Sequence, residues 1–308
     1  MTGTSREAAL PRRRSWALRS SERWFLLFVA PWLIGFVFLQ AGPLLASAAL
    51  ALTDWLPPAP PTFIGLDNFT RLAADERFIH ALYNTVVYAF WTVVPGLAIG
   101  LAIALVLQGR GRLRAGVRTT VFLPAIVAGV ATALMWGWVF NPRSGIVNGL
   151  LESIGVRGPA WFDDPTWAMP ALVVMGLWNV GINVVVYAAA LNNVRRDLLE
   201  SVLLDGGGAW ARFRHVVWPA LTPMTFYLAI VNAVAAFQVF TPTYVLTAGG
   251  PQDATLTTSL YTYEEAFGAG RLAYASAMNL VVLVLVMALT VLHFRFGERR
   301  VSYGAAEG

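Results

Sequence analysis

The chain has 308 residues, of which 57% are hydrophobic and only 13% are charged, and its formal net charge is +5. A soluble domain has about 25% charged residues, so the composition excludes an ordinary soluble protein and indicates a membrane protein. All 22 basic residues are arginine and cysteine is absent. This sequence therefore contains no lysine-bearing phosphate-binding loop, no disulfide bond and no thiolate metal site.

Six long stretches of the sequence contain no Asp, Glu or Arg. They cover residues 24–53, 78–109, 119–142, 165–194, 216–252 and 272–294. A helix needs about 20 apolar residues to cross the hydrocarbon core, and each stretch is long enough. Strands of a membrane barrel would alternate apolar and polar residues, whereas these runs are uniformly apolar. The sequence therefore predicts an all-α integral membrane protein with six transmembrane helices.

The arginines are distributed unequally between the two sides of the predicted membrane protein. The N-terminal tail, the second loop, the fourth loop and the C-terminal tail together carry 17 of the 22. The opposite side carries only Arg71, Arg77, Arg143, Arg157 and Arg271. The positive-inside rule then places both termini in the cytoplasm. Because this topology explains the basic charge, nucleic-acid binding is not predicted.

The domain organisation follows from this topology. Residues 1–23 form an Arg-rich cytoplasmic tail, residues 24–296 form one transmembrane domain, and residues 297–308 form a second cytoplasmic tail. Basic residues next to the first span are expected to contact membrane lipid.

The cytoplasmic loop at residues 197–218 has more internal organisation than a simple connector. If residues 197–205 are helical, one arc of that helix is apolar and carries Leu198, Leu199, Val202 and Leu203. Gly206, Gly207 and Gly208 would end this helix, residues 209–217 would form a second short helix, and Pro219 would begin the fifth span. Composition alone leaves two interpretations open, a loop lying on the membrane surface and a docking surface for a soluble partner.

The motif in this loop resembles the EAA loop of ATP-binding-cassette importer permeases. It comprises Glu200-Ser-Val-Leu-Leu-Asp205-Gly206-Gly, then Trp210, Arg212-Phe213 and Pro219-Ala-Leu-Thr-Pro223. Ser201-Val202 stands where the family has two alanines, and Gly207 stands where another alanine is common. Downstream, Phe237-Gln-Val-Phe240 and Tyr244-Val-Leu-Thr-Ala-Gly-Gly-Pro251 are similar to the carbohydrate-uptake branch of the family. The resemblance extends from about residue 24 to residue 296.

This resemblance implies a type I importer permease in the bacterial inner membrane. Such a subunit would pair with a second homologous permease, bind two ATPase subunits in the cytoplasm and receive solute from an extracytoplasmic solute-binding protein. The solute would be a sugar or a related polyol or glycerol phosphate. This chain would bind no cofactor, because ATP and Mg would be used by the ATPase subunits. The ATPase-docking core would be Glu200, Asp205 and Gly206, flanked by Arg212 and Phe213.

Several uncharged polar residues within the spans are candidates for the substrate pathway, because amide and phenol groups hydrogen-bond sugar hydroxyls without the cost of burying a charge. They are Asn179, Asn183, Tyr187, Asn232, Gln238 and Asn279. The first three recur every four residues and are therefore expected on one helix face. The alternative is that each amide hydrogen-bonds a neighbouring helix. Tyr244 fits an aromatic residue at the membrane interface.

No catalytic or metal-binding constellation is predicted, so the chain is not expected to be an enzyme. The three histidines are scattered along the sequence, and the acidic pairs Asp163-Asp164 and Glu264-Glu265 are expected to be solvated loop charges. An ion-coupled secondary transporter is the alternative function. Such transporters bury an ionisable coupling residue within a span, and the six uncharged stretches contain no Asp, Glu or Arg.

Overall fold

The computed structural model describes residues 20–109 and 111–297, so most of the two predicted tails lies outside the described residues. The chain divides into two units, residues 1–49 and 50–308. In the first unit, α1 (Ser20–Phe36) continues through a π-helical turn (Val37–Ala41) into α2 (Gly42–Leu50). The apolar helix from Leu27 to Leu50 is long enough to cross a membrane and matches the first predicted span.

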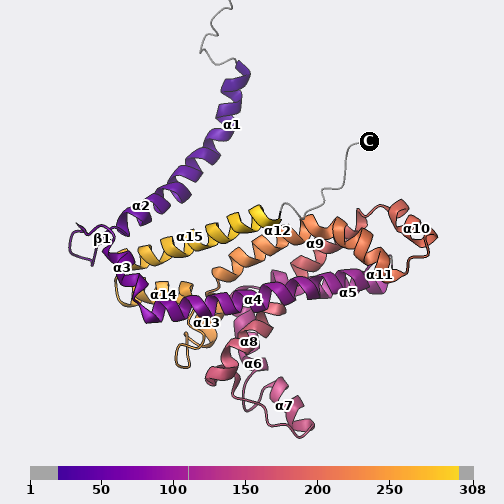
Figure 1. Ribbon diagram of the computed structural model, residues 1–308. Coiled ribbons are helices and arrows are strands. Elements are labelled where there is room, and N and C mark those ends of the chain that lie inside the picture. The colour runs from indigo at the N-terminus through magenta and orange to yellow at the C-terminus, as the bar shows by residue number, and fades with distance from the viewer. Residues whose placement is uncertain (1–19, 110, 298–308) are drawn as a thin grey trace, which may run out of the picture. The chain divides into compact units, whose positions relative to one another are not determined.

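Within residues 50–109 and 111–297, the second unit contains helices and one two-stranded antiparallel hairpin (Figure 1). Its first half comprises β1 (Thr53–Asp54), β2 (Thr62–Phe63), α3 (Asp67–Ala73), α4 (Glu76–Val106), α5 (Arg112–Phe122), the 3-10 turn η2 (Leu123–Ile126), α6 (Gly129–Val139), α7 (Ile146–Ser153) and the 3-10 turn η3 (Trp161–Asp163). Its second half comprises α8 (Pro165–Leu177), α9 (Gly181–Asn192), α10 (Arg196–Leu204), α11 (Ala209–Arg212), the π-helical turn η4 (Phe213–Val217), α12 (Trp218–Phe237), α13 (Thr241–Leu246), α14 (Thr258–Tyr263), the π-helical turn η5 (Glu264–Gly268) and α15 (Leu272–Gly297).

Among the described residues, four helices are long and apolar enough to span a membrane, and two bent helix pairs bring the number to as many as six. In the third predicted span the two halves meet at 111°, and in the fourth they meet at 41°. The sharper break lies at Val127 and Ala128, whose ψ angles of 135° and 136° are extended rather than helical. The structure is therefore compatible with six spans, although neither break was predicted from the sequence.

The centre of the second unit is the packing of α4 against α8, α9 and α12. One glycine permits the close contact of α4 with α9, and another permits that of α9 with the end of α5. A Cβ atom on Gly100 of α4 would lie 2.7 Å from Cβ of Asn183 on α9, and one on Gly181 would lie 2.5 Å from the carbonyl oxygen of Val121. The core between α4, α9 and α12 is apolar and includes Leu101, Ala104, Val184, Leu221 and Leu228.

Polar side chains connect distant parts of the chain at the end of the unit formed by α3, α14 and the start of α4. Asp75 caps α4 by accepting hydrogen bonds from the backbone N–H groups of Arg77 and Phe78. Its other carboxylate oxygen accepts hydrogen bonds from the hydroxyl groups of Tyr261 and Tyr274, at 2.9 and 2.6 Å. The start of α4 is thereby tied to α14 and α15.

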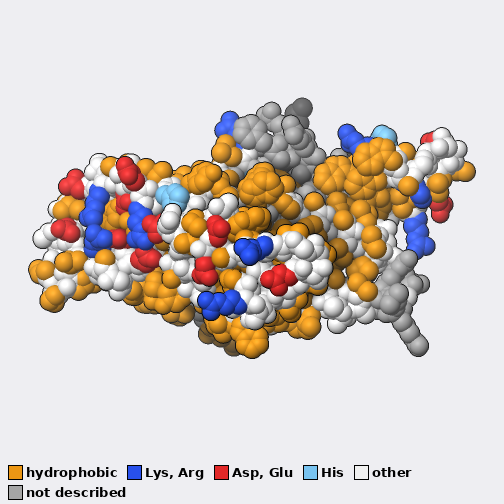
Figure 2. Space-filling view, turned by 90° about the horizontal axis from the view of Figure 1, so that it is seen from below, with side chains coloured by type: hydrophobic (Ala, Val, Ile, Leu, Met, Phe, Trp, Pro, Cys, Tyr) orange, Lys and Arg blue, Asp and Glu red, His pale blue; other side chains and the backbone are white. Residues whose placement is uncertain are grey.

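Arg77 holds the segment that joins α13 to α14. Its guanidinium donates two hydrogen bonds to the carboxylate of Asp253, at 2.8 and 3.0 Å, and lies 2.9 Å from the carboxylate of Glu264. The adjacent Glu265 is only 5% exposed and pairs with Arg271. Figure 2 shows acidic and basic side chains gathered together at this end of the unit.

The sequence interpretation of Glu264 and Glu265 as solvated loop charges is therefore wrong. Both carboxylates have arginine partners from outside their own helical turn. Asp164 also has a structural role, because it accepts a hydrogen bond from the backbone N–H of Thr166 and caps α8, whereas Asp163 is exposed as expected. Arg77 and Glu264 lie far apart in the sequence. A local sequence pattern does not indicate which distant residues form an ion pair.

Replacing Arg77 by Met is expected to lower the free energy of unfolding by about 1 kcal/mol at neutral pH, because a bidentate ion pair in a network is lost. The hydrogen bonds from Arg77 lower the pKa of Asp253 below its ordinary value. This contribution is therefore present above the ordinary aspartate pKa of about 3.9 and disappears as the pH falls through the lower folded-state pKa.

The measurement is thermal unfolding in detergent from pH 7 to pH 3. Arg143→Met is the matched control, because Arg143 is exposed on another loop. An Arg77→Met variant with the same stability as the control across this range would contradict the role assigned to the ion pair.

Candidate functional site

Helix α10 ends in a well-formed glycine cap. Gly206 has φ = +77°, a left-handed conformation that glycine adopts without steric cost. The N–H of Gly206 donates to the carbonyl oxygen of Leu203, and the N–H of Gly207 donates to that of Val202, at 3.0 and 2.8 Å. These two bonds form a Schellman motif, which turns the chain back after α10. The helix predicted over 197–205, with glycine at its end, is confirmed, because α10 covers Arg196–Leu204 and Gly206 forms its cap.

The exposed side of this cap carries three of the predicted docking residues. Glu200, Asp205 and Gly206 are all exposed. Large apolar side chains lie on the same segment, and Leu204 is 89% exposed and Trp210 is 72% exposed. Only part of the predicted apolar arc is exposed, because Leu199 and Val202 are half-buried while Leu198 and Leu203 are exposed.

Arg212 and Phe213 lie on the inner side of the loop. Both are half-buried and line a cavity of about 260 Å³ between the loop and the ends of α4 and α9. The ring of Phe213 stacks on Trp210 at 5.7 Å and contacts Trp218 at 6.3 Å. Phe213 also packs against the apolar core of α4, α9 and α12. An aromatic series therefore extends from the exposed loop surface to the membrane helices.

Val202 and Gly207 lie close together in this cap. A Cβ atom on Gly207 would lie 2.5 Å from Cγ1 of Val202 and 2.8 Å from its carbonyl oxygen. The backbone of the cap as well as the side chain of Val202 therefore favours glycine at position 207.

The second half of the loop differs from the prediction. Residues 209–217 do not form a separate short helix, because α11, η4 and α12 follow one another without a break. The N–H of Trp218 bonds the carbonyl oxygen of Phe213 in a π-type turn. A widened turn here accommodates Pro219, which has no N–H to donate to the helical ladder. The loop is thus directly continuous with the fifth span.

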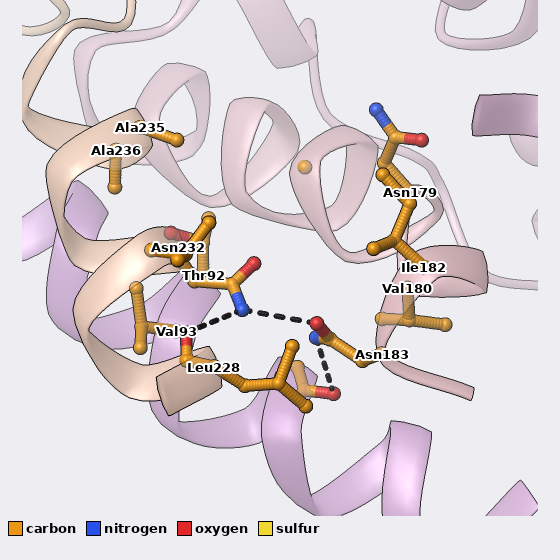
Figure 3. Close-up of a pocket in the computed structure, with 13 residues that line it drawn as sticks. Thr92, Val93, Asn179, Val180, Ile182, Asn183, Leu228, Asn232, Ala235 and Ala236 are labelled. Atoms are coloured by element: carbon orange, nitrogen blue, oxygen red, sulfur yellow. Dashed lines mark hydrogen bonds between the residues drawn. The ribbon is translucent and has the colours of Figure 1, made fainter. Parts of the chain in front are cut away.

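A second candidate site lies among α4, α8, α9 and α12. It is a cavity of about 260 Å³ whose polar lining comes from Thr92, Asn179, Asn183 and Asn232. The amide of Asn232 donates to Oδ1 of Asn183 at 2.9 Å and to the carbonyl oxygen of Leu228 at 2.8 Å. The amide of Asn183 points to the carbonyl oxygen of Gly96 at 3.4 Å. Figure 3 shows Asn183 and Asn232 facing one another while the side chain of Asn179 turns away from them.

The structure does not bring the other pathway candidates into this cavity. Tyr187 is buried and donates to Oγ1 of Thr225 at 3.2 Å. Gln238 is exposed at the end of α12 and is not among the residues that line the cavity. Asn279 lines a different cavity, beside α14 and α15. Of the three residues expected on one helix face, Asn179 and Asn183 line the same cavity although the bend before α9 lies between them, whereas Tyr187 does not line it.

No group of three or more His, Asp or Glu side chains that could hold a metal ion occurs in residues 20–109 and 111–297. Sequence reasoning missed the hydrogen-bonded acidic residues at the end of the unit formed by α3, α14 and the start of α4. The one sequence signal that indicates them is the occurrence of Arg and of Asp or Glu in loops on the same predicted side of the membrane.

Comparison with known proteins identifies relatives over the whole chain. The sequence profile of the family described as "binding-protein-dependent transport system inner membrane component" matches residues 96–302. The probable ABC transporter permease protein YesP of Bacillus subtilis is 33% identical over 312 aligned residues, covering 100% of both chains. The sn-glycerol-3-phosphate transport system permease protein UgpA of Pectobacterium atrosepticum is 33% identical over 78% of this chain and 82% of its own length.

Solved structures share the fold. A chain of a bacterial alginate ABC transporter, solved in complex with an alginate pentasaccharide-bound periplasmic protein, superposes with a TM-score of 0.84 at 22% identity. That match covers 95% of this chain and 100% of the other. A second structure, of a bacterial ABC transporter involved in alginate import, gives a TM-score of 0.78 at 24% identity over 90% of this chain and 96% of the other.

Replacing Asn183 by Leu is expected to destabilise the protein by about 0.6–2 kcal/mol, because the hydrogen bonds that join α9 to α4 and α12 are lost. Asn179→Leu serves as the control, because Asn179 is exposed on the same cavity. Thermal unfolding in detergent measures both. Equal stability of the two variants would show that the Asn183 amide does not hold the helices together.

Proposed function

The chain belongs to the family of inner membrane components of binding-protein-dependent transport systems, and from this premise we propose that it forms half of a translocation pathway for a sugar or a related polyol or glycerol phosphate. A second, homologous permease would form the other half. Two ATPase subunits would drive transport, and an extracytoplasmic solute-binding protein would deliver the solute. The fold of the alginate transporter chain, which matches nearly the whole of this chain, supports this arrangement.

The exposed cap of α10 is the observation that carries the proposal. Glu200, Asp205 and Gly206 form its polar part, and Leu204 and Trp210 supply exposed apolar side chains beside it. Apolar anchors surrounded by polar groups are typical of specific protein interfaces. An ATPase subunit that receives this cap would cover the apolar side chains, which would otherwise remain exposed to water.

The connection from this cap to the membrane is short and stiff. Trp210, Phe213 and Trp218 follow one another in ring contact, and Phe213 packs on the core of α4, α9 and α12. Displacement of the cap when the ATPase dimer closes would therefore move these helices rather than bend a flexible connector. Arg212 and Phe213 act in this proposal as positioning residues behind the docking surface. The expected result is a rigid-body exchange between inward- and outward-facing states.

The cavity lined by Asn179, Asn183 and Asn232 is the proposed point of solute passage in this chain. Its mixture of apolar walls and few amide groups is typical of sites for small polar ligands. The hydrogen bonds of Asn183 and Asn232 give these residues a structural role as well. Asn179, whose amide is exposed, is the residue best placed to contact the solute.

Replacing Gly206 by Asp tests the docking surface. The variant is expected to insert in the membrane but to lose at least about tenfold in affinity for the ATPase subunits, equivalent to about 1.4 kcal/mol, because a side chain and a charge enter the interface. Co-purification with the ATPase subunits and ATP-driven uptake into vesicles are the measurements.

Gly155→Asp is the matched control. Gly155 also has a left-handed backbone, with φ = +78°, and a Cβ atom added at either glycine would meet no heavy atom within 4 Å. Gly155 lies after α7, on the predicted opposite side of the membrane. If Gly206→Asp kept its ATPase subunits and transported as well as Gly155→Asp, the docking assignment would be wrong. Uptake by the isolated chain without any ATPase would favour a secondary transporter.

A further inference from the structure

A third cavity, of about 450 Å³, lies beside the turn from α14 through η5 into α15. One side of it is formed by a series of aromatic rings. Phe240 lies 5.2 Å from Tyr263, and Tyr263 lies 5.2 Å from Phe267, measured between ring centroids. Tyr244 stacks behind Phe240 at 5.2 Å. The last ring in the series, Phe267, is 72% exposed.

Polar side chains also line this cavity. Ser276 and Asn279 come from the first turns of α15 and are three residues apart, so they lie on the same helix face. Asn279 is exposed. Ser259 and Thr262 of α14 also line the cavity, but their hydroxyl groups already donate to the carbonyl oxygen of Phe237 and to the sulfur of Met278. Aromatic rings and the polar groups of Asn279 and Ser276 therefore line one cavity.

Lipid is a poor occupant of this surface. An amide or hydroxyl group that faces hydrocarbon without a partner costs several kcal/mol. Asn279 is exposed on this cavity, so the cavity is expected to face water or another polar partner. The predicted topology places it near the extracytoplasmic end of α15, on the side from which the solute arrives.

Charges near the cavity are already paired within the chain. Glu264 is held by Arg77 and Glu265 by Arg271, and none of the described residues that line the cavity is charged. An anionic solute such as a glycerol phosphate would therefore find no cationic partner among them. A pyranose ring suits the same walls, because its C–H face packs on an aromatic ring while its hydroxyl edge bonds amide and hydroxyl groups.

We propose that this aromatic cavity is a carbohydrate subsite that holds a neutral pyranose unit at the extracytoplasmic entrance of the pathway. The inference rests on the proposed transport function. It adds a ligand class and a second binding site to that function. None of the residues lining this cavity lines the cavity at Asn183. Phe240 and Tyr263 provide the stacking surface, Phe267 lies at its exposed rim, and Asn279 with Ser276 provides the hydrogen bonds.

The absence of cysteine from the chain permits a direct test. Phe267→Cys places a single thiol at the rim of the cavity, and Leu150→Cys, on the exposed face of α7, is the matched control. The complex with its second permease and ATPase subunits is reacted with a maleimide in lipid nanodiscs. The probes are maltopentaose, cellopentaose and glycerol 3-phosphate, each added separately.

A neutral oligosaccharide at ten times its dissociation constant is expected to slow the reaction of the 267 thiol by about tenfold. The control thiol should be unaffected, and glycerol 3-phosphate should protect neither. Tyr263→Leu, added to Phe267→Cys, should abolish protection, whereas Tyr263→Phe should retain it. Protection that persists in the Tyr263→Phe variant would show that the aromatic ring, and not the hydroxyl group, is required.

Two results would overturn the subsite. One is a 267 thiol that reacts in the isolated chain but not in the complex, which would show that the second permease covers the cavity. The other is a thiol that reacts in the complex and that neither neutral oligosaccharide protects. In both cases ATPase assembly through the α10 cap would be intact, so failure of the subsite is distinguishable from failure of the proposed function.

Discussion

The contact between α4, α9 and α12 is the constraint on which the rest of the second unit depends. Gly100 lets the backbones of α4 and α9 approach until an added Cβ atom would overlap Asn183, and the Asn183–Asn232 hydrogen bond joins α12 to the same point. Within hydrocarbon, apolar burial gives little preference for one helix arrangement over another. Close packing at small residues and buried amide bonds therefore determine which helices associate.

This central contact sets the positions of both ends of the unit. The α10 cap lies between α9 and α12, so two of the three packed helices flank it directly, and the ring of Phe213 rests on their common core. At the other end, Asp75 and Arg77 tie the first turn of α4 to α14 and to the segment around Asp253. Helix α4 thus connects the two ends as one continuous 31-residue rod.

The sequence predicted the parts of this fold that depend on the pattern of neighbouring residues. Segregation of charge located the membrane segments, and the spacing of Leu198 to Gly206 predicted a helix with a glycine stop. Features that depend on distant partners escaped prediction. The pairing of Arg77 with Asp253 and Glu264, and the widened turn that joins α11 to α12, depend on contacts and backbone geometry that residue type alone does not specify.

The candidate site was predicted in part for the same reason. Asn183 and Asn232 meet in the structure, whereas Tyr187 and Asn279 do not join them, because Tyr187 bonds Thr225 one turn farther along α9 and Asn279 lies on α15 beside a separate cavity. Residue type thus identified groups able to bind a sugar hydroxyl, and packing decided which of them also hold helices together.

The most direct test of the central claim is the accessibility of a single thiol at Leu204, which is 89% exposed on the α10 cap. A membrane-impermeant maleimide is applied to Leu204→Cys in vesicles of known orientation, with and without the ATPase subunits. The account predicts reaction only in inside-out vesicles and strong protection when the ATPase subunits are bound. Reaction from the extracytoplasmic side, or full reactivity in the assembled transporter, would contradict it.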